Sequence, residues 1–365
     1  MPETTTTLAE LLASFDPLDP RDLRGFRHAL PTPVTLIGCP DSLPLAFEVT
    51  VIGDIRVDVR SGVPTRRFVD MDTDEQVRTP VTVDVGGTAI GFARAAAPHF
   101  ALVHVIGAMG HDHWSEFIRT SFDFARIDSS ISEVEGPNSL VVVLRDQGTP
   151  ENPHGVRLIV SDAETPYGQL DADRIRAHSA FIERSDALVI DGYALLEEAT
   201  AEAVDVAVDL AVAAGVPVCF DIVPHRIDSL LAFERLRPFI HRSSLITTEA
   251  QTLMRLLGRE VPERITAEVV QDLIDGLPPD LADWQRTWLV RYGEGNMDKT
   301  SAISPSHHSV TYPTGYAQAT TVTGYGYVVA AAELKWWLTN YTRAAQIYPR
   351  LAERSELVEP RRFRP

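Results

Sequence analysis

Cysteine is almost absent from this sequence of 365 residues, which contains only Cys39 and Cys219. Two cysteines provide neither a disulfide framework nor the ligand spacing of a zinc site, so both kinds of small stapled domain are excluded. Basic residues are also scarce, since 33 of them against 51 acidic residues give a net charge of −18. A nucleic-acid-binding surface needs a basic stripe, and this balance argues against one.

Long apolar runs are missing as well. No stretch approaches the roughly 20 apolar residues of a membrane-spanning helix. The first residues, from Met1 to Thr4, lack the basic start and apolar run of a secretory signal. We therefore expect a cytoplasmic protein with neither a membrane nor a nucleic-acid partner. Its hydrophobic content of 44% and charged content of 23% are ordinary for a globular chain.

The sequence pattern divides the chain into three parts. Residues 1–46 read as an N-terminal extension, in which prolines from Pro17 to Pro44 punctuate a mostly irregular segment. Residues 47–350 read as one large domain, and 351–365 as a C-terminal tail. We interpret the extension as a surface wrap or an oligomer arm, with an acidic segment that binds a partner as the alternative.

Alternating strands and helices in the large domain predict an α/β fold with a mostly parallel sheet that is covered on both sides. Polar and β-branched segments within about 55–83 and 138–162 read as strands of a smaller, partly exposed sheet. Ligands of parallel sheets bind at the carboxyl ends of the strands. In this sequence Asp221, Thr248 and Gly293 fall at such ends.

Two glycine-rich turns carry the functional signal. Val85-Gly86-Gly87-Thr88 opens an alanine-rich helix, and Thr321-Val322-Thr323-Gly324-Tyr325-Gly326-Tyr327 opens an apolar one. Such a turn at a helix N-terminus suits an anion, because unpaired backbone N–H groups and the helix dipole point at the ligand. Either turn alone is a weak signal, and their order and separation along the chain make it more specific.

The order of these motifs resembles that of the ribokinase-like (PfkB) carbohydrate kinases, from about Phe47 to Leu338. Besides the two turns, the resemblance is carried by Gly53 and Asp58, by the segment 105–112 and by the segment 221–226. It implies a ribokinase-like three-layer α/β sandwich with a small β-sheet lid. It also implies a sugar- or nucleoside-like ligand between lid and sheet, ATP across the later strand ends, and a homodimer contact through the lid, which no residue here compels.

The resemblance also assigns site residues. Asp58, Gly86, Gly87, Gly91 and Asp221 stand at substrate-binding positions. The positions that bind the nucleotide or anion are Thr248, Gln251, Gly293, Thr323, Gly324, Tyr325 and Gly326. No metal ligand is assigned, because the short cluster His111-Asp112-His113 is more typical of a helix start than of a metal site.

The sequence departs from the family at the positions that carry out the chemistry. Tyr327 stands where the family has the aspartate that accepts the proton of the attacking hydroxyl, and a tyrosine with a pKa near ~10 is a poor base. Gln251 replaces the glutamate of an Asn-x-x-Glu motif that helps to place magnesium, and Thr321 replaces an acidic residue. Arg291 replaces a small hydroxyl residue, and Gly91 replaces a substrate-contacting asparagine.

Three functional hypotheses follow. The first is a pseudokinase, which keeps a binding site for a sugar, a nucleoside or a phosphorylated metabolite after phosphotransfer has been lost or much weakened. The second is an active ATP- and Mg²⁺-dependent sugar or nucleoside kinase with another base, such as Asp58 or Asp112. The third is a different reaction with Tyr327 as a general acid. Tyr325 and Tyr327 would either stack on a ligand or fill an emptied nucleotide site, and the sequence favours neither.

Overall fold

The computed structural model describes residues 47–338, apart from 63–65, 123–125, 148, 150–155, 163–164, 224–226, 282–285, 294–297, 304–308, 314–325 and 336. The extension at 1–46 and the tail at 351–365 lie outside this part of the chain, as do Thr321, Thr323, Gly324 and Tyr325. The domain boundaries drawn from the sequence therefore stay a prediction.

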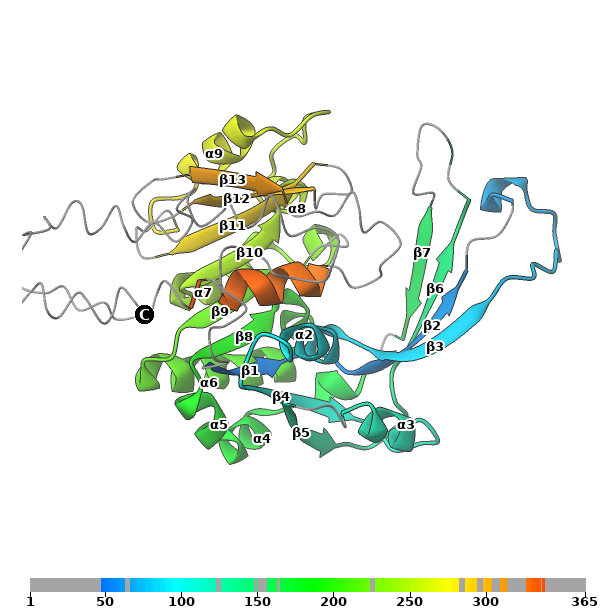
Figure 1. Cartoon of the computed structure of the whole chain (residues 1–365), viewed down its shortest axis with the longest axis horizontal. Coiled ribbons are helices and arrows are strands. Elements are labelled where there is room, and N and C mark those ends of the chain that lie inside the picture. The colour runs from blue at the N-terminus through cyan, green and yellow to red at the C-terminus, as the bar shows by residue number, and fades with distance from the viewer. Residues whose placement is uncertain are drawn as a thin grey trace, which may run out of the picture.

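A mostly parallel sheet forms the centre of the molecule (Figure 1). Within the described residues it has nine strands in the order β13-β12-β11-β10-β9-β8-β1-β4-β5. Only the pairs β11–β12 and β12–β13 are antiparallel, and they form one edge. In chain order the strands are β1 (Glu48–Ile52), β4 (Leu102–Met109), β5 (Ile127–Glu133), β8 (Ala187–Asp191), β9 (Val218–Ile222), β10 (Leu245–Glu249), β11 (Thr287–Tyr292), β12 (Lys299–Ile303) and β13 (Ser309–Pro313).

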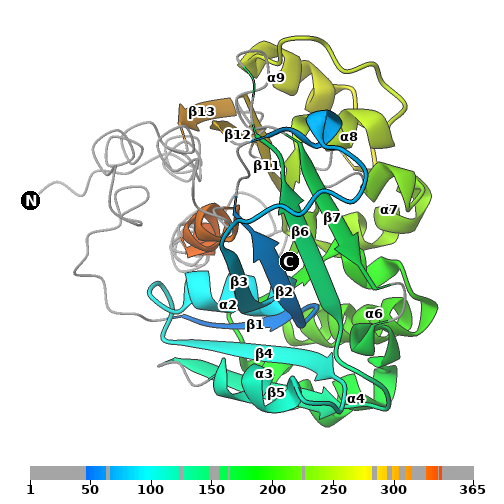
Figure 2. The ribbon, with the colours of Figure 1, turned by 90° about the vertical axis from the view of Figure 1, so that its right-hand side faces the viewer.

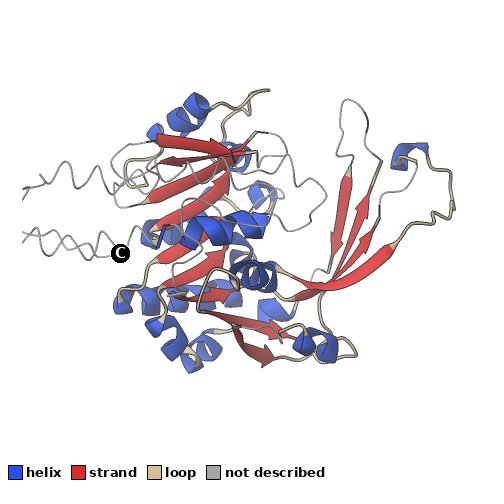
Figure 3. Ribbon diagram, in the orientation of Figure 1, coloured by secondary structure: helices blue, strands red, loops and turns tan. Residues whose placement is uncertain are grey.

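Helices cover both faces of this sheet (Figure 3). One face packs against α4 (Ala172–Ala177), α5 (Ser179–Arg184), α6 (Glu198–Ala214), α7 (Phe233–Arg242), α8 (Ala250–Leu256) and α9 (Ala267–Asp275). The other packs against α2 (Thr88–Ala96), α3 (Ser115–Thr120) and a helix over 326–338. The predicted three-layer α/β sandwich is confirmed. No helix in the described ranges has the length and apolarity that a bilayer crossing requires.

Strand β8 shows why the sequence folds in this way. Leu188 and Ile190 point into one core, and Ala187 and Val189 into the other. A strand whose two faces are both buried must be apolar throughout, and successive side chains of a strand alternate between the faces. Its only charged residue is Asp191, at the carboxyl end.

A second, four-stranded sheet projects from the side of the main sheet at which its parallel strands end (Figure 1). Figure 2 shows this lid from the front. Its order is β3-β2-β6-β7, with β2 and β6 parallel and the outer pairs antiparallel. The strands are β2 (Arg56–Ser61), β3 (Val81–Gly86), β6 (Leu140–Arg145) and β7 (Arg157–Ser161). Short 3-10 turns occur at η2 (Phe68–Asp70), η3 (Pro166–Gln169), η4 (Gly192–Leu195) and η5 (Ile227–Ser229).

Candidate functional site

Three polar side chains lie next to one another where β8, β9 and β10 end. Asp191 is the register partner of Asp221, and Asp221 is the register partner of Thr247. Side chains of register partners in neighbouring strands project from the same face of a sheet. The fold therefore places two carboxyl groups and a hydroxyl side by side at the edge where parallel sheets bind ligands.

Asp191 is a residue that the sequence prediction missed. It is 5% exposed, and its carboxylate accepts hydrogen bonds from the Thr88 hydroxyl at 2.5 Å and from the Tyr193 backbone N–H at 2.8 Å. Burial raises the pKa of Asp191 to about 6, although the hydrogen bond from Thr88 acts in the opposite direction. One feature of the sequence could have identified Asp191: it is a single acidic residue at the end of an apolar strand, as Asp221 is.

Asp221 shares this environment. Burial raises the pKa of Asp221, and the positive charge of the nearby Arg291 acts against that rise. Two carboxyl groups on adjacent strands disfavour each other's ionisation, and the negative charge of Asp221 also contributes to the raised pKa of Asp191. The pair is therefore a place where a proton or a cationic group would be bound more strongly than in water.

A buried ion pair fixes the last helix to the sheet beside these carboxyl groups. Nη2 of Arg291 lies 2.7 Å from Oε2 of Glu333, and these side chains are 6% and 1% exposed. The Thr300 hydroxyl donates to the other carboxylate oxygen of Glu333 at 3.1 Å. Arg291 thus has a structural partner on the helix that contains Gly326 and Tyr327.

Tyr327 lies directly against Gly91. A Cβ atom added at Gly91 would stand 2.5 Å from Cε2 of the Tyr327 ring, so the ring occupies the space that a side chain at Gly91 would need. Burial raises the pKa of the Tyr327 hydroxyl above its ordinary value, and the nearby Asp191 adds to the effect. Gly91 and Tyr327, at both of which the sequence analysis expects a departure from the family pattern, are therefore in direct contact.

Only a small cavity of about 30 Å³ remains at this point. Such a volume is of the order of one water molecule and much smaller than a sugar ring. The polar groups around it are Thr88, Asp191, Asp221, Thr247 and the ring of Tyr327, with apolar residues completing the wall. The structure thus brings the predicted residues Asp221 and Tyr327 to one cavity and adds Asp191 to them.

Gly86 and Gly87 connect the lid to the main sheet, and another part of the chain lies very close to the backbone at both positions. Gly87 has φ of 97°, and a Cβ there would lie 2.2 Å from the carbonyl oxygen of Asp54. A Cβ at Gly86 would lie 2.3 Å from Oδ2 of Asp58. Gly87 therefore requires glycine, whereas a side chain at Gly86 would require the Asp58 carboxylate to move. Asp58 is 8% exposed and forms an ion pair with Arg60. Ligand binding by these residues stays a prediction.

The other predicted residues lie elsewhere at the same edge. Thr248 is buried at the end of β10, Gln251 lies in the first turn of α8, and Gly293, with φ of 93°, follows β11. None of these three lines the cavity. Thr323, Gly324 and Tyr325 lie outside the described residues, and Gly326 lies in the last helix.

Asp112 is engaged in holding its own loop. Its carboxylate accepts hydrogen bonds from the backbone and side-chain N–H groups of Asn138 and from the backbone N–H of Trp114. Asp112 therefore stabilises the loop that leads into α3, in agreement with the interpretation of His111-Asp112-His113 as a helix start. In the described part of the chain, His, Cys, Asp and Glu side chains form no group of three that could hold a metal ion.

The raised pKa of Asp191 predicts a pH dependence of stability. Between about pH 4 and pH 6 the folded state holds a proton that the unfolded state has released, so the free energy of unfolding falls as the pH rises through this window. Over the whole window the contribution of Asp191 decreases by roughly 2 to 3 kcal/mol. We expect Asp191→Asn to abolish this decrease, as measured by urea unfolding at pH 4, 5, 6 and 7.

The same substitution at Asp173, whose side chain is 92% exposed, is the control. Parallel stability curves for the wild type and Asp191→Asn between pH 4 and 7 would show that this carboxyl group does not titrate as described.

Solved structures with the same fold are numerous. Ribokinase from Giardia lamblia superposes with a TM-score of 0.57 at 15% identity, over 80% of this chain and 92% of that one. A PfkB protein from Polaromonas sp. JS666 gives 0.56 at 15% identity, over 82% and 96%. An E. coli structure that contains ATP and Mg²⁺ gives 0.54 at 14% identity, over 73% and 78%. At these identities the similarity shows the fold alone.

No curated protein matches the sequence. The family model for the pfkB family carbohydrate kinases, in contrast, matches residues 47–278, which is more than half of the chain. The matched segment includes the diglycine, Asp191 and Asp221, and it ends before Arg291 and Tyr327. The chain therefore belongs to the PfkB family of carbohydrate kinases.

Proposed function

We propose that this protein binds a sugar- or nucleoside-like small molecule and that its phosphotransfer activity has been lost or much weakened. The observation that carries the proposal is Tyr327. A general base must be deprotonated when its substrate arrives, and the raised pKa of this buried phenol keeps it protonated at neutral pH. The ring also occupies space beside Gly91 into which a reacting hydroxyl group would have to enter.

The residues at the carboxyl edge of the main sheet also fit ATP and Mg²⁺ poorly. Mg²⁺ at a nucleotide site is usually held by one or two carboxylates together with the phosphates. Gln251 offers a neutral amide at the position where the family has a glutamate, and the carboxylate of Glu333 is already paired with Arg291. No step of the proposed function involves a nucleotide, and ATP and Mg²⁺ are cofactors only of the alternative function below.

One observation favours that alternative, an active sugar or nucleoside kinase with a different base. Asp191 lines the same cavity as Tyr327, and its pKa of about 6 is close to that of an effective general base at neutral pH. Asp58 and Asp112 suit the role less well, because the first is paired with Arg60 and the second is bound by Asn138. In this alternative Asp191 would accept the proton of the acceptor alcohol.

A turnover assay separates the two functions. We expect the purified protein with ATP, Mg²⁺ and a panel of sugars and nucleosides to show no phosphorylated product at ordinary kinase rates of ~1 s⁻¹. The alternative would be established by phosphoryl transfer whose rate falls 10²-fold or more in Asp191→Asn and whose pH dependence shows a pKa near 6. Tyr327→Phe keeps the ring without the hydroxyl, so a loss of activity in this variant alone would identify Tyr327 as a general acid.

The contact between Tyr327 and Gly91 makes a second prediction, which concerns stability. Gly91→Asn inserts a side chain where the tyrosine ring lies, so we expect it to destabilise the wild-type background. In the Tyr327→Asp background the ring is absent, and Gly91→Asn should lower the free energy of unfolding by a smaller amount. Unfolding free energies of the four proteins should give a favourable coupling of about 1 to 3 kcal/mol.

Gly258→Asn is the control for that experiment, because Gly258 has nothing within 4 Å of an added Cβ. The loss of stability in Gly258→Asn comes only from the positive φ of 65° at this position, so it should be the same in both backgrounds. A coupling near zero at Gly91 would mean that the ring does not fill the space of the missing side chain.

We also propose that the lid contacts a second copy of this chain. The register of the lid strands places Val59, Val83, Val142, Leu144, Leu158 and Val160 on one side of the sheet. Of these, Val83, Leu158 and Val160 are 44%, 48% and 52% exposed. Contiguous exposed apolar side chains on a sheet usually mark an interface. Members of the PfkB family often pair through their lids, and this supports a second copy of this chain as the partner.

The homodimer has a direct test. We expect the wild type to elute with twice the mass of one chain in size-exclusion chromatography with light scattering. Val83→Glu with Leu158→Glu should produce a monomer, since burying two carboxylates in an apolar contact is strongly unfavourable. Val212→Glu, at an exposed valine of α6, is the matched control. A monomeric wild type at micromolar concentration would contradict the proposal.

A further inference from the structure

The polar lining of the cavity beside Tyr327 is rich in hydrogen-bond acceptors. Two carboxyl groups, Asp191 and Asp221, and two hydroxyl groups, Thr88 and Thr247, line it. Among the described residues of its wall there is no lysine, arginine, histidine, asparagine or glutamine. An ionised carboxyl group accepts hydrogen bonds and donates none. The cavity therefore presents negative charge and lone pairs, and it lacks a strong donor.

One of the two hydroxyl groups has no partner. Thr247 is 2% exposed, and its hydroxyl oxygen has hydrogen-bonding geometry to no group in the described part of the chain. Thr88, in contrast, donates to Asp191 at 2.5 Å and accepts from the backbone N–H of Asp54 at 3.1 Å. A buried polar atom without a partner is unfavourable. A donor that enters the cavity would provide one for Thr247.

The arginines at this edge of the sheet are already paired with other carboxylates. The positive charge of Arg291 acts on Asp221, but Arg291 is itself paired with Glu333 at 2.7 Å. Arg56, at the start of β2, pairs with Asp54. Within the described residues, neither carboxyl group of the cavity forms an ion pair of its own. Their negative charge is therefore available to a cation from outside the chain.

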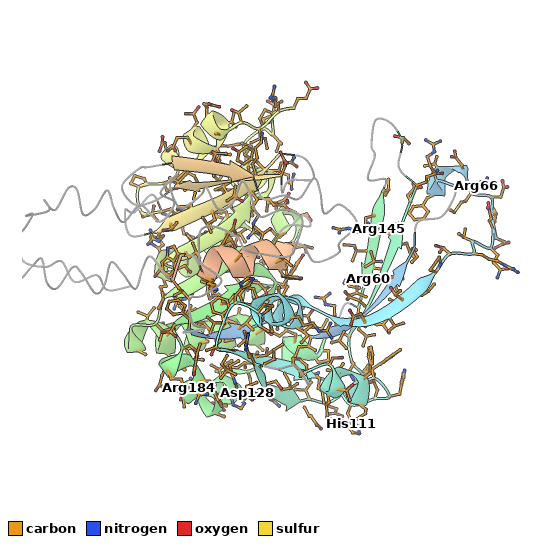
Figure 4. The ribbon with its side chains drawn as sticks, viewed as in Figure 1. Arg60, Arg66, His111, Asp128, Arg145 and Arg184 are labelled. Atoms are coloured by element: carbon orange, nitrogen blue, oxygen red, sulfur yellow. The ribbon has the colours of Figure 1, made fainter. Side chains whose placement is uncertain are left out.

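The lid adds no cation to the wall of the cavity. Figure 4 shows Arg60 and Arg145 on the projecting lid, and neither side chain lines the cavity. Arg60 pairs on the lid itself with Asp58. The positive charges of these two arginines thus belong to a different part of the protein from the two carboxyl groups.

Tyr327 adds an aromatic wall to these acceptors. Its ring lines the cavity together with Asp191 and Asp221. An aromatic ring attracts a cation electrostatically, and aromatic side chains commonly bind ammonium ligands. Burial raises the pKa of the Tyr327 hydroxyl, so the phenol stays neutral and adds no third negative charge.

A cation between the two carboxyl groups would also relieve their mutual repulsion. Burial raises the pKa of Asp191, and the negative charge of Asp221 contributes to that rise. A positive charge close to a carboxyl group favours its ionised form. A phosphate or carboxylate in the same place would instead add another negative charge to a buried pair.

An ammonium group matches this cavity in charge, hydrogen bonding and size. It carries three N–H donors and no lone pair, whereas a hydroxyl group carries one donor and two lone pairs. The cavity of about 30 Å³ has room for about one water molecule, and an ammonium group needs a similar space. A sugar ring or an acetylated amine is larger.

We propose that the small molecule bound at this site carries a primary ammonium group, which enters the cavity and is bound by Asp191, Asp221 and the ring of Tyr327. The remainder of the ligand lies outside the cavity. This inference rests on the proposed function in that it requires a ligand at this site. It names the chemical class of that ligand, which is an amino sugar or an amine analogue of a nucleoside.

The test compares matched forms of one molecule by thermal shift and calorimetry. The sets are glucosamine, glucose and N-acetylglucosamine; galactosamine, galactose and N-acetylgalactosamine; and 5′-amino-5′-deoxyadenosine with adenosine. We expect at least one amine to raise the melting temperature at concentrations where its neutral counterparts do not. Potassium chloride at the same ionic strength is the control for salt and for an inorganic cation.

Two variants remove the charge and keep the shape of the side chain. We expect Asp191→Asn and Asp221→Asn each to bind the amine ~30-fold more weakly or worse, because a buried charge loses its partner. Their affinity for a neutral sugar should change much less. Tyr327→Leu should weaken binding of the amine by about 3-fold or more. Asp173→Asn makes the same change of net charge at a side chain that is 92% exposed, and should bind as the wild type does.

The two aspartates are changed separately, so that if one variant does not fold, the other still decides. Equal shifts by an amine and its neutral counterpart, or by its N-acetyl form, would overturn the inference. Unchanged amine affinity in the folded aspartate variants would do the same. A shift by potassium chloride alone that these variants abolish would assign the cavity to an inorganic cation and would also overturn it.

The remaining outcomes separate this inference from the proposed function. If no amine shifts the melting temperature at ~10 mM, where even weak binding shows by mass action, the ammonium inference is wrong. A neutral sugar or nucleoside that binds in the same experiment would leave the proposed function intact. Phosphorylation of an amine that binds in this way would support the inference and overturn the loss of phosphotransfer.

Discussion

The packing of the Tyr327 ring against the backbone of Gly91 is the contact on which the geometry of the candidate site depends. A glycine is required opposite the ring, because a Cβ at Gly91 would come within 2.5 Å of it. The ring in turn closes the space beside Asp191 and Asp221 to a cavity of about 30 Å³. One aromatic contact therefore limits the space beside these two carboxyl groups.

The buried pair of Arg291 and Glu333 holds this contact in place. It joins the last helix to β11 in the interior, and removing one partner of such a pair costs several kcal/mol because the other charge stays buried. Gly91 and Arg291 are thus both contacted by residues of the same helix, Tyr327 and Glu333.

Much of the fold followed from the sequence, because buried parallel strands are short apolar runs and the turns between them are rich in glycine. The mostly parallel sheet with helices on both faces was predicted for this reason and is confirmed. The edge strand β5, with the polar sequence Ile127–Glu133, carries no such apolar run. Asp191 was missed because the sequence shows it only as the last residue of a strand. The pairing of β8 with β9 in the structure places it beside Asp221.

By itself the sequence determined the family, the two-sided burial of the sheet and the absence of a carboxylate at position 327, because these depend on residue types and their order. Only the tertiary structure decided which residues meet. Asp191 and Asp221 become neighbours through strand pairing, Tyr327 reaches Gly91 across more than 200 positions of chain, and Thr247 joins the two carboxyl groups through the pairing of β9 with β10. Such distances are set by packing between elements, which no local pattern in the chain contains.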